Sequence, residues 1–137
     1  MDIEVKQLEG STFVGRGESN HWTVMDAARE VDGHGAATQP MEMLLISLGG
    51  CTGIDLNTLL DKMRVDYDDI DINISGERND EHPKYYTGIH VDYRIYGTDL
   101  DEDKVAKAVR LTQEKYCSVT HSLDAEVSYD YEIVSPE

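Results

Sequence analysis

The chain has 137 residues, of which 39% are hydrophobic, and its formal net charge at neutral pH is −16. This length predicts a single domain, residues 1–137, with enough apolar side chains to bury a core. A surface with this much negative charge repels phosphate backbones and anionic lipid headgroups. We therefore expect neither nucleic acid nor a membrane as a partner. Residues 1–6 lack the basic and apolar regions of a secretory signal, and we therefore expect a cytoplasmic location.

The first thirty residues predict short strands. Ile3 and Val5 alternate with polar residues, and the segments Phe13-Val14 and Trp22–Met25 are rich in residues that favour strands. Residues 31–39 show no apolar periodicity, so they predict a loop.

Apolar residues at helical spacing predict a long central helix from Pro40 to about Arg64. Proline suits the first turn of a helix, because the missing N–H has no partner there anyway. The helix is apolar around most of its circumference, which predicts burial on most sides. Ser, Thr, Asn, Asp and Gly residues interrupt its apolar run, which makes it too polar to span a membrane.

Three longer strands and a second helix follow. Apolar and polar residues alternate over 70–75, 89–96 and 125–133, which predicts strands with one buried and one solvated face, as in antiparallel sheets. A helix is expected over about Asp101–Lys115, with Asp99 and Glu102 resembling a capping box. The order of elements predicts an α+β fold. The central helix needs more cover than one small sheet provides, so we expect a second copy of the chain to pack against it.

Three glycines surround one cysteine inside the central helix, in the segment Gly49-Gly50-Cys51-Thr52-Gly53. Each glycine in a helix interior costs roughly 1 kcal/mol relative to alanine, or on the order of 3 kcal/mol for the three. We expect an offsetting benefit, either the close approach of another backbone or room for a substrate at the sulfur.

The second cysteine, Cys117, lies just past the second helix, and only the fold can bring it to Cys51. One hypothesis is a redox pair, in which one thiol attacks and the other resolves a sulfenic acid by forming a disulfide. The alternative is that both are small buried residues without reactivity, since free cysteine is among the most buried residue types.

A reactive thiol needs surroundings that favour the thiolate. Asp55 lies one helical turn after Cys51, and a carboxylate there raises the pKa of the thiol. A cation must then come from elsewhere, with Arg16 the first candidate and Arg29 and Arg94 weaker ones.

Cys117 and His121 have the i, i+4 spacing of two metal ligands on one helix. A structural zinc ion requires four ligands, and the sequence offers no second close pair of Cys or His. We therefore expect no metal site and no bound cofactor.

The segments Pro40–Thr52 and Glu114–Val119, each with one cysteine, resemble the OsmC/Ohr family of osmotically inducible and organic hydroperoxide resistance proteins. The order of elements matches over nearly the whole chain. The Leu-Gly-Gly-Cys-Thr form is similar to a less characterised OsmC-like branch.

The resemblance implies an OsmC-like fold, with two chains intertwined as a homodimer. It implies a thiol peroxidase that reduces organic hydroperoxides, with Cys51 as the peroxidatic and Cys117 as the resolving cysteine. Arg16, supplied across the dimer, would stabilise the developing charge, and Glu42 would hold that arginine. A dithiol such as a lipoyl group would reduce the disulfide.

Two departures from the family pattern keep a second hypothesis open. Met41, rather than the glutamate, follows Pro40 directly, and nine residues separate Glu42 from Cys51. Nine residues are about two and a half helical turns, so the two side chains face opposite sides of a regular helix. The alternatives are therefore a Cys-based hydroperoxide reductase and an OsmC-like dimer that binds a small ligand without turnover.

Overall fold

The computed structural model describes residues 1–136, and the chain folds as two compact units. The first runs from Met1 to Leu44, and the second begins at Leu45. Each unit is described by itself, and the single domain expected from the length stays a prediction.

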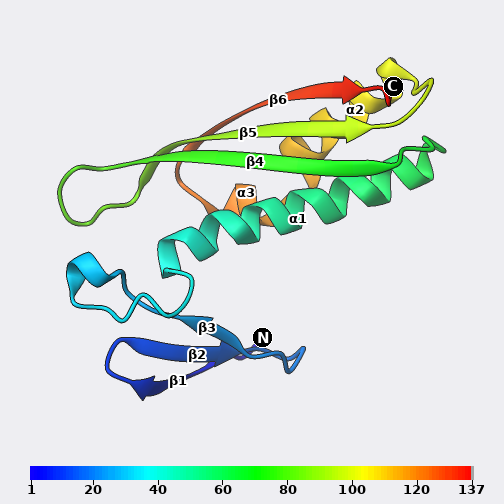
Figure 1. Ribbon diagram of the computed structural model, residues 1–137. Helices are drawn as coiled ribbons and strands as arrows, with labels where there is room; N and C mark the ends of the chain where they lie inside the picture. Colours follow the sequence, from blue (N-terminus) through cyan, green and yellow to red (C-terminus); the bar gives the residue numbers. More distant parts are fainter. Residues whose placement is uncertain (137) are drawn as a thin grey trace. The chain divides into compact units, whose positions relative to one another are not determined.

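The first unit is built on an antiparallel sheet in the order β1-β2-β3, drawn in blue in Figure 1. Its strands are β1 (Glu4–Glu9), β2 (Thr12–Arg16) and β3 (Thr23–Met25), which confirms the short strands predicted from alternation and from strand-favouring residues. A short 3₁₀ helix, Arg29–Val31, follows β3, and residues 32–37 form no helix or strand.

Asp26 is the buried polar centre of the first unit. Its side chain accepts hydrogen bonds from the hydroxyls of Ser11, at 2.5 Å, and Thr12, at 3.1 Å, and from the backbone N–H groups of Ala27 and Ala36. These bonds, first of all the one from Ser11, hold the pKa of Asp26 well below its usual range. The ionised carboxylate therefore fixes the loop after β3 to the start of β2.

The helix α1 (Pro40–Lys62) extends into the second unit and confirms the predicted central helix. By length and composition alone it is apolar enough to cross a membrane, which corrects the expectation that its polar residues exclude this; the core helix of a soluble protein meets the same criteria. Within α1, four residues at successive i+4 positions are fully buried: Leu48, Thr52, Leu56 and Leu60. Ile46 and Ile54 lie on the opposite face and are more than half exposed, so the helix is less completely buried than its composition predicts.

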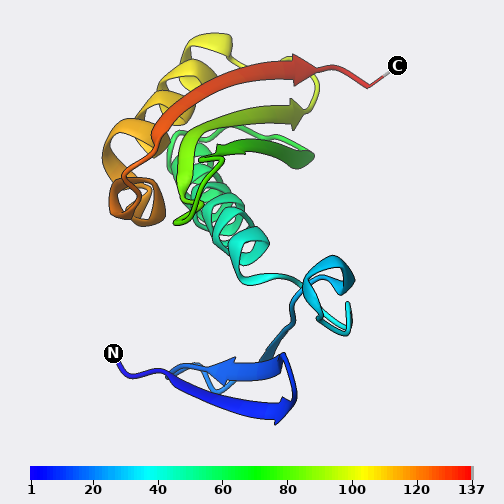
Figure 2. The ribbon, with the colours of Figure 1, turned by 90° about the vertical axis from the view of Figure 1, so that its left-hand side faces the viewer.

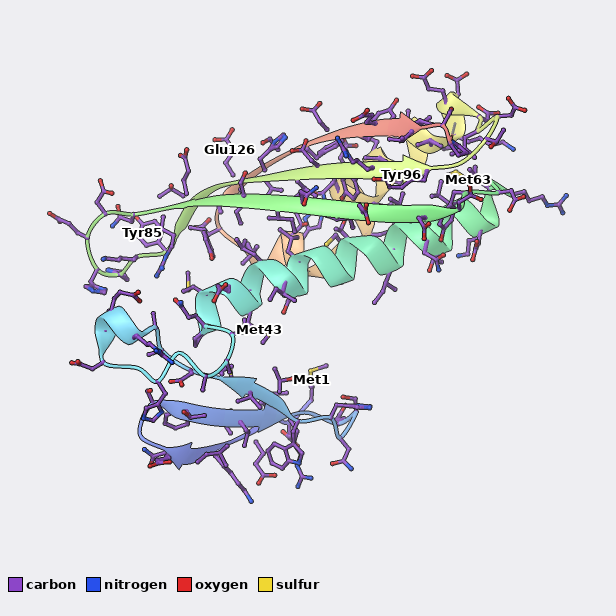
Figure 3. The ribbon with its side chains drawn as sticks, in the orientation of Figure 1. Met1, Met43, Met63, Tyr85, Tyr96 and Glu126 are labelled. Carbon is purple, nitrogen blue, oxygen red and sulfur yellow. The ribbon has the colours of Figure 1, made fainter. Side chains whose placement is uncertain are left out.

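The second unit contains a sheet in the order β4-β5-β6, with strands β4 (Asp69–Arg78), β5 (Tyr86–Tyr96) and β6 (Glu126–Val134). One face packs against helices, and the other is polar; Glu126, at the start of β6, points away from the helices in Figure 3. β4 pairs antiparallel with β5, but β6 pairs parallel with β5, which corrects the expectation of a wholly antiparallel sheet. Alternation reports only which face is buried, whereas the crossover through the second helix sets the direction of β6.

The crossover contains more helix than the sequence predicted. It runs through α2 (Glu102–Leu111), a π-helical turn η2 (Thr112–Tyr116) and α3 (Ser118–Ser122). Asp101, rather than Asp99, caps α2 by accepting a hydrogen bond from the backbone N–H of Lys104. The inner face of α2 is buried as expected, at Val105, Ala108 and Val109.

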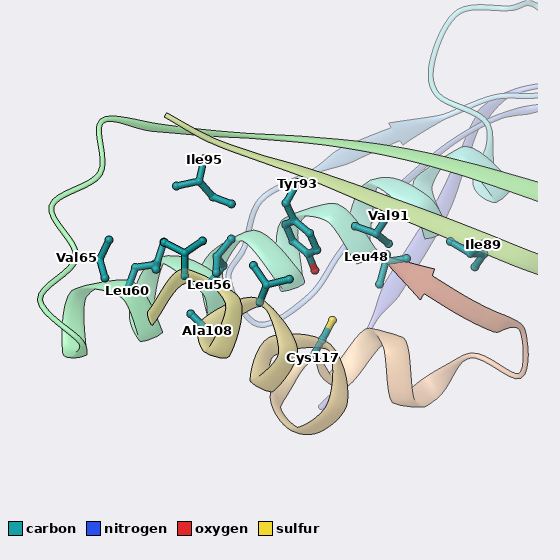
Figure 4. Close-up of a cluster of buried hydrophobic side chains, with 12 residues drawn as sticks. Leu48, Leu56, Leu60, Val65, Ile89, Val91, Tyr93, Ile95, Ala108 and Cys117 are labelled. Carbon is teal, nitrogen blue, oxygen red and sulfur yellow. The ribbon is translucent and has the colours of Figure 1, made fainter. Parts of the chain in front are cut away.

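The core of the second unit lies between the sheet and the helices on one of its faces (Figure 2). Figure 4 shows side chains from α1, β5 and α2 in this core, with the Tyr93 hydroxyl and the Cys117 sulfur pointing toward one another. Cys117 is therefore part of the core rather than of the surface.

The glycines around Cys51 allow α1 to lie close to β4. A Cβ atom placed on Gly49 would lie 3.2 Å from Ile74 Cδ1, and one on Gly53 would lie 3.2 Å from Ile72 Cδ1. A Cβ on Gly50 would meet nothing within 4 Å. Two of the three glycines thus accommodate the sheet, and the third leaves the exposed face of the helix bare.

Candidate functional site

The fold brings together the two cysteines that the sequence keeps far apart. Cys51 projects from the middle of α1, and Cys117 immediately precedes α3. Their sulfur atoms and a carboxylate oxygen of Asp55 all lie within 4.8 Å of one another. Both thiols are free. Because a disulfide has an S–S bond of about 2.05 Å, a movement of less than about 3 Å would join them.

The two thiols differ in exposure. Cys51 is partly exposed, whereas Cys117 is completely buried. A reagent from solution therefore reaches Cys51 first, and Cys117 lies behind it as an internal reaction partner.

The environment of Cys117 acts on its pKa in opposite directions. Burial raises the pKa of the Cys117 thiol, and the nearby Cys51 raises it further. The hydroxyl and the backbone N–H of Thr120 lower it by hydrogen bonding to the sulfur. Burial is the largest of these effects, so the pKa of Cys117 is raised overall.

Asp55 contacts Cys51 directly. The Cys51 thiol donates a hydrogen bond to Asp55 Oδ2 at a distance of 3.9 Å, which confirms that the i, i+4 spacing places them together. Burial raises the pKa of Asp55, and the hydrogen bond from Cys51 lowers it by less. Asp55 is thus a partly desolvated acid whose partner is the exposed thiol.

A buried polar network that sequence reasoning missed lies next to Cys117. Gln113 Nε2 donates to the hydroxyl of Tyr93 and, at 3.2 Å, to Thr52 Oγ1, and the two hydroxyls also bond to each other. Thr120 Oγ1 donates to Gln113 Oε1 at 3.4 Å, which links the network to the residue beside Cys117. Burial raises the pKa of Tyr93, so its hydroxyl stays protonated. Alternation over 89–96 put Tyr93 on the buried face of its strand, but no signal in the sequence pointed to Gln113 as its partner.

Arg16 makes its described contacts within the first unit. Its guanidinium forms an ion pair with Glu4 at 3.2 Å, donates to Asn20 Oδ1 at 2.8 Å, and lies over the ring of Trp22. The weaker candidates are also engaged: Arg29 donates to the carbonyl of His34, and Arg94 pairs with Glu132.

Glu42 acts at the start of α1. Its side chain accepts a 3.1 Å hydrogen bond from the backbone N–H of Gln39, three residues earlier. This is the contact that a glutamate at the third helical position makes in a capping box. The sequence signal for this role was the position of Glu42 two residues after Pro40.

Two groups within residues 1–136 have the donors and spacing to hold a metal ion. Cys51, Asp55 and Cys117 offer two sulfurs and an oxygen, one ligand fewer than the four of a structural zinc site. His90, Asp92 and Asp130 form an exposed group on the outer face of the sheet. His121 belongs to neither group.

Comparisons with known proteins show the family of the chain. The family model described as "OsmC-like protein" matches residues 33–132. Protein YhfA of Escherichia coli K12 is 38% identical over 137 residues, which cover 98% of this chain and 99% of that protein.

Solved structures share the fold. A hypothetical protein from Aquifex aeolicus VF5 superposes with a TM-score of 0.86 at 29% identity, covering 99% of this chain and 97% of that one. A Legionella pneumophila structure, described as an organic hydroperoxide resistance protein OsmC and predicted redox protein, superposes with a TM-score of 0.69 at 15% identity. This second likeness covers 97% of this chain and 96% of that one, and it concerns the fold alone.

Proposed function

Because the chain belongs to the family of OsmC-like proteins, we propose that it reduces organic hydroperoxides to alcohols with the thiols of Cys51 and Cys117. The observation that carries the proposal is the approach of the two sulfurs to within 4.8 Å of each other. A pair of inert core thiols would not require one partly exposed member beside a buried one.

The exposure of the thiols supports their roles. The sulfur of Cys51 attacks the terminal oxygen of the hydroperoxide, the O–O bond breaks, and the alcohol leaves with a proton. Cys51 is then a sulfenic acid. The sulfur of Cys117 attacks that of Cys51, water leaves, and a disulfide forms. An external dithiol, such as a lipoyl group, reduces the disulfide and takes no permanent place in the site.

Substitution of each cysteine tests the proposal. The reduced protein is mixed with cumene hydroperoxide and a dithiol, and peroxide consumption is followed. We expect Cys51→Ser to abolish consumption. We expect Cys117→Ser to stop at a Cys51 sulfenic acid, which dimedone traps and mass spectrometry detects. Consumption that continues in Cys51→Ser at the wild-type rate would overturn the proposal.

A homodimer is part of the proposal. The exposed face of α1 carries Ile46, Gly50 and Ile54 at successive i+4 positions, with exposed fractions of 57% for Ile46 and 69% for Ile54. An apolar groove of about 330 Å³ lies beside this face, lined in part by Gly49, Gly50 and Ile74. In the first unit, the apolar residues Ile3, Val5, Leu8 and Val24 are also exposed. A second copy of the chain would cover such surfaces, as the OsmC/Ohr resemblance implies.

Light scattering after size-exclusion chromatography tests the dimer. We expect the wild type to run as a dimer and Ile54→Arg to run as a monomer, because an arginine cannot be buried unpaired in an apolar interface. Asn73→Arg, at an exposed polar position on the outer face of β4, is the matched control. A monomeric wild type would contradict the dimer.

We also propose that Arg16 is supplied by the partner subunit and stabilises the charge that develops on the peroxide. Its ion pair with Glu4 keeps the guanidinium oriented before that role. Arg16→Gln should then slow the oxidation of Cys51 without changing which disulfide forms. An unchanged rate of Cys51 oxidation in Arg16→Gln would show that Arg16 does not act in the reaction. A cytoplasmic location, where thiols stay reduced, completes the proposal.

The second candidate function is the binding of a small ligand without turnover. The carboxylate of Asp55 beside Cys51 favours it, because the oxygen at 3.9 Å accepts a hydrogen bond that only a protonated thiol can donate. This function predicts that the wild type consumes no peroxide in the assay above.

A further inference from the structure

The partly exposed thiol of Cys51 has a carboxylate, rather than a cation, as its described hydrogen-bond partner. The Cys51 sulfur lies 3.9 Å from Asp55 Oδ2, one helical turn away on α1. If Asp55 only opposed ionisation of the thiol, this arrangement would work against the proposed reaction. The geometry admits another role for the carboxylate, which is to exchange a proton with the sulfur.

We propose that Asp55 is a catalytic residue that takes the proton of the Cys51 thiol and returns it to the leaving alkoxide. The proposal rests on the hydroperoxide reduction proposed above and adds a proton carrier to it. It differs from the resemblance-based account, in which Arg16, held by Glu42, stabilises the developing charge and no residue carries the proton.

The proposed reaction balances in protons and electrons. Asp55 accepts the thiol proton as the Cys51 sulfur attacks the terminal oxygen of the hydroperoxide. The S–O bond forms, the O–O bond breaks, and the sulfur is oxidised while the peroxide is reduced. The leaving alkoxide takes the proton from the carboxylic acid of Asp55. The products are a sulfenic acid, an alcohol and the original carboxylate.

The surroundings of Asp55 suit this role. Among the cysteines, histidines and carboxylates of residues 1–136, those grouped within 4.8 Å of it are Cys51, on its own helix, and Cys117, immediately before α3. Burial raises the pKa of Asp55, which brings it closer to that of a thiol and so eases the transfer in both directions. The ion pairs described in the second unit lie elsewhere, for example between Arg94 and Glu132 and between Arg110 and Glu114. Asp55 is therefore free of a competing salt bridge among the contacts described for residues 45–136.

Two reactions of the same thiol separate proton transfer from simple electrostatics. Reaction with iodoacetamide requires a thiolate and has no alkoxide to protonate. Removing the carboxylate charge by Asp55→Asn should favour the thiolate, so alkylation of Cys51 near pH 7 should accelerate. Reduction of a hydroperoxide by the same variant should slow by about 10²- to 10⁴-fold, the usual contribution of a general acid–base group. A purely electrostatic Asp55 predicts that both rates rise together.

The experiment measures both rate constants from pH 5 to 10 in the Cys117→Ser background, in which only Cys51 reacts. Cumene hydroperoxide and iodoacetamide are the two reagents. Asp55→Asn is compared with Asp55→Glu, which should restore part of the peroxide rate, and with Asp61→Asn, a matched loss of charge at an exposed position of the same helix. Circular dichroism shows whether each variant folds.

The outcomes are distinct. Opposite changes in the two rates for Asp55→Asn, with both rates unchanged in Asp61→Asn, support the proton carrier. A peroxide rate in Asp55→Asn equal to or above that of the parent at every pH overturns the role of Asp55 while leaving the proposed function intact. Failure of the parent itself to form a sulfenic acid overturns the proposed function, and with it this role.

Discussion

The sulfur atoms of Cys51 and Cys117 lie within 4.8 Å of each other, although one belongs to the central helix and the other to the crossover between β5 and β6. The sheet and the helices packed against it hold both cysteines in one core. This distance makes a reactive thiol pair chemically possible. The partly exposed Cys51 can meet a reagent from solution, and the buried Cys117 can react with Cys51.

Thr120 should control how fast the buried Cys117 thiol reacts with the Cys51 sulfenic acid. Its hydroxyl lowers the pKa of Cys117, so Thr120→Val should reduce the thiolate fraction near neutral pH. We expect disulfide formation from the Cys51 sulfenic acid to slow by roughly three- to tenfold, the effect of losing one hydrogen bond of about 1 kcal/mol. The difference should shrink as the pH rises. Stopped-flow measurement of the resolution step checks this, with Ser122→Ala as the control at a nearby exposed hydroxyl; equal rates in Thr120→Val would contradict it.

Asp55 should cost the protein stability at neutral pH. Burial raises its pKa in the folded state, so folding favours the protonated form. Its contribution to stability is complete below the ordinary pKa of 3.8 and is lost as the pH rises through the raised folded-state value. Asp55→Asn should therefore raise the melting temperature at pH 7 and lose that advantage near pH 3. Calorimetry across this range gives the answer, and a lower melting temperature at pH 7 would reverse the sign of the argument.

Asp26 should behave in the opposite way. The hydrogen bonds that it accepts, led by that of Ser11, lower its pKa in the folded state. Its contribution is present above the ordinary pKa of 3.8 and disappears as the pH falls through the lowered value. We expect Asp26→Asn to lower the melting temperature at pH 7 and to flatten its dependence on pH below 4. A variant that melts like the wild type would show that the loop after β3 does not depend on this carboxylate.

The polar network beside Cys117 should matter for stability more than for chemistry. Gln113→Leu leaves the buried hydroxyls of Tyr93 and Thr52 with only each other as partners. The loss of the amide should lower the free energy of unfolding by about 1–3 kcal/mol. Urea unfolding measures the change, and Glu114→Gln at the exposed neighbouring position is the control. A change below about 0.5 kcal/mol would mean that water replaces the amide.

Most of the elements follow from local patterns in the sequence. Alternation located the strands and their buried faces, and helical spacing located α1 and the inner face of α2. Alternation could not reveal that β6 runs parallel to β5, because both directions bury the same face. The sequence also did not predict the π-helical turn η2 between α2 and α3, because five residues of π-helical geometry leave no periodic signal.

The site was predictable where its contacts are local. The i, i+4 spacing alone placed Asp55 beside Cys51. The meeting of Cys51 with Cys117, and that of Gln113 with Tyr93 and Thr52, depends on elements that only the tertiary fold brings together. The first of these followed from resemblance rather than from spacing. The contact of Glu42 with Gln39 shows that a residue assigned by resemblance can also have a local role as a helix cap.

The most direct test of the thiol pair is the mass of the protein after one equivalent of cumene hydroperoxide, without added reductant. We predict the loss of two hydrogens per chain and, after digestion under non-reducing conditions, a single linked peptide pair that joins Cys51 to Cys117. Wild-type chains that keep two free thiols after this treatment, or that oxidise at Cys51 without ever linking to Cys117, would contradict the account.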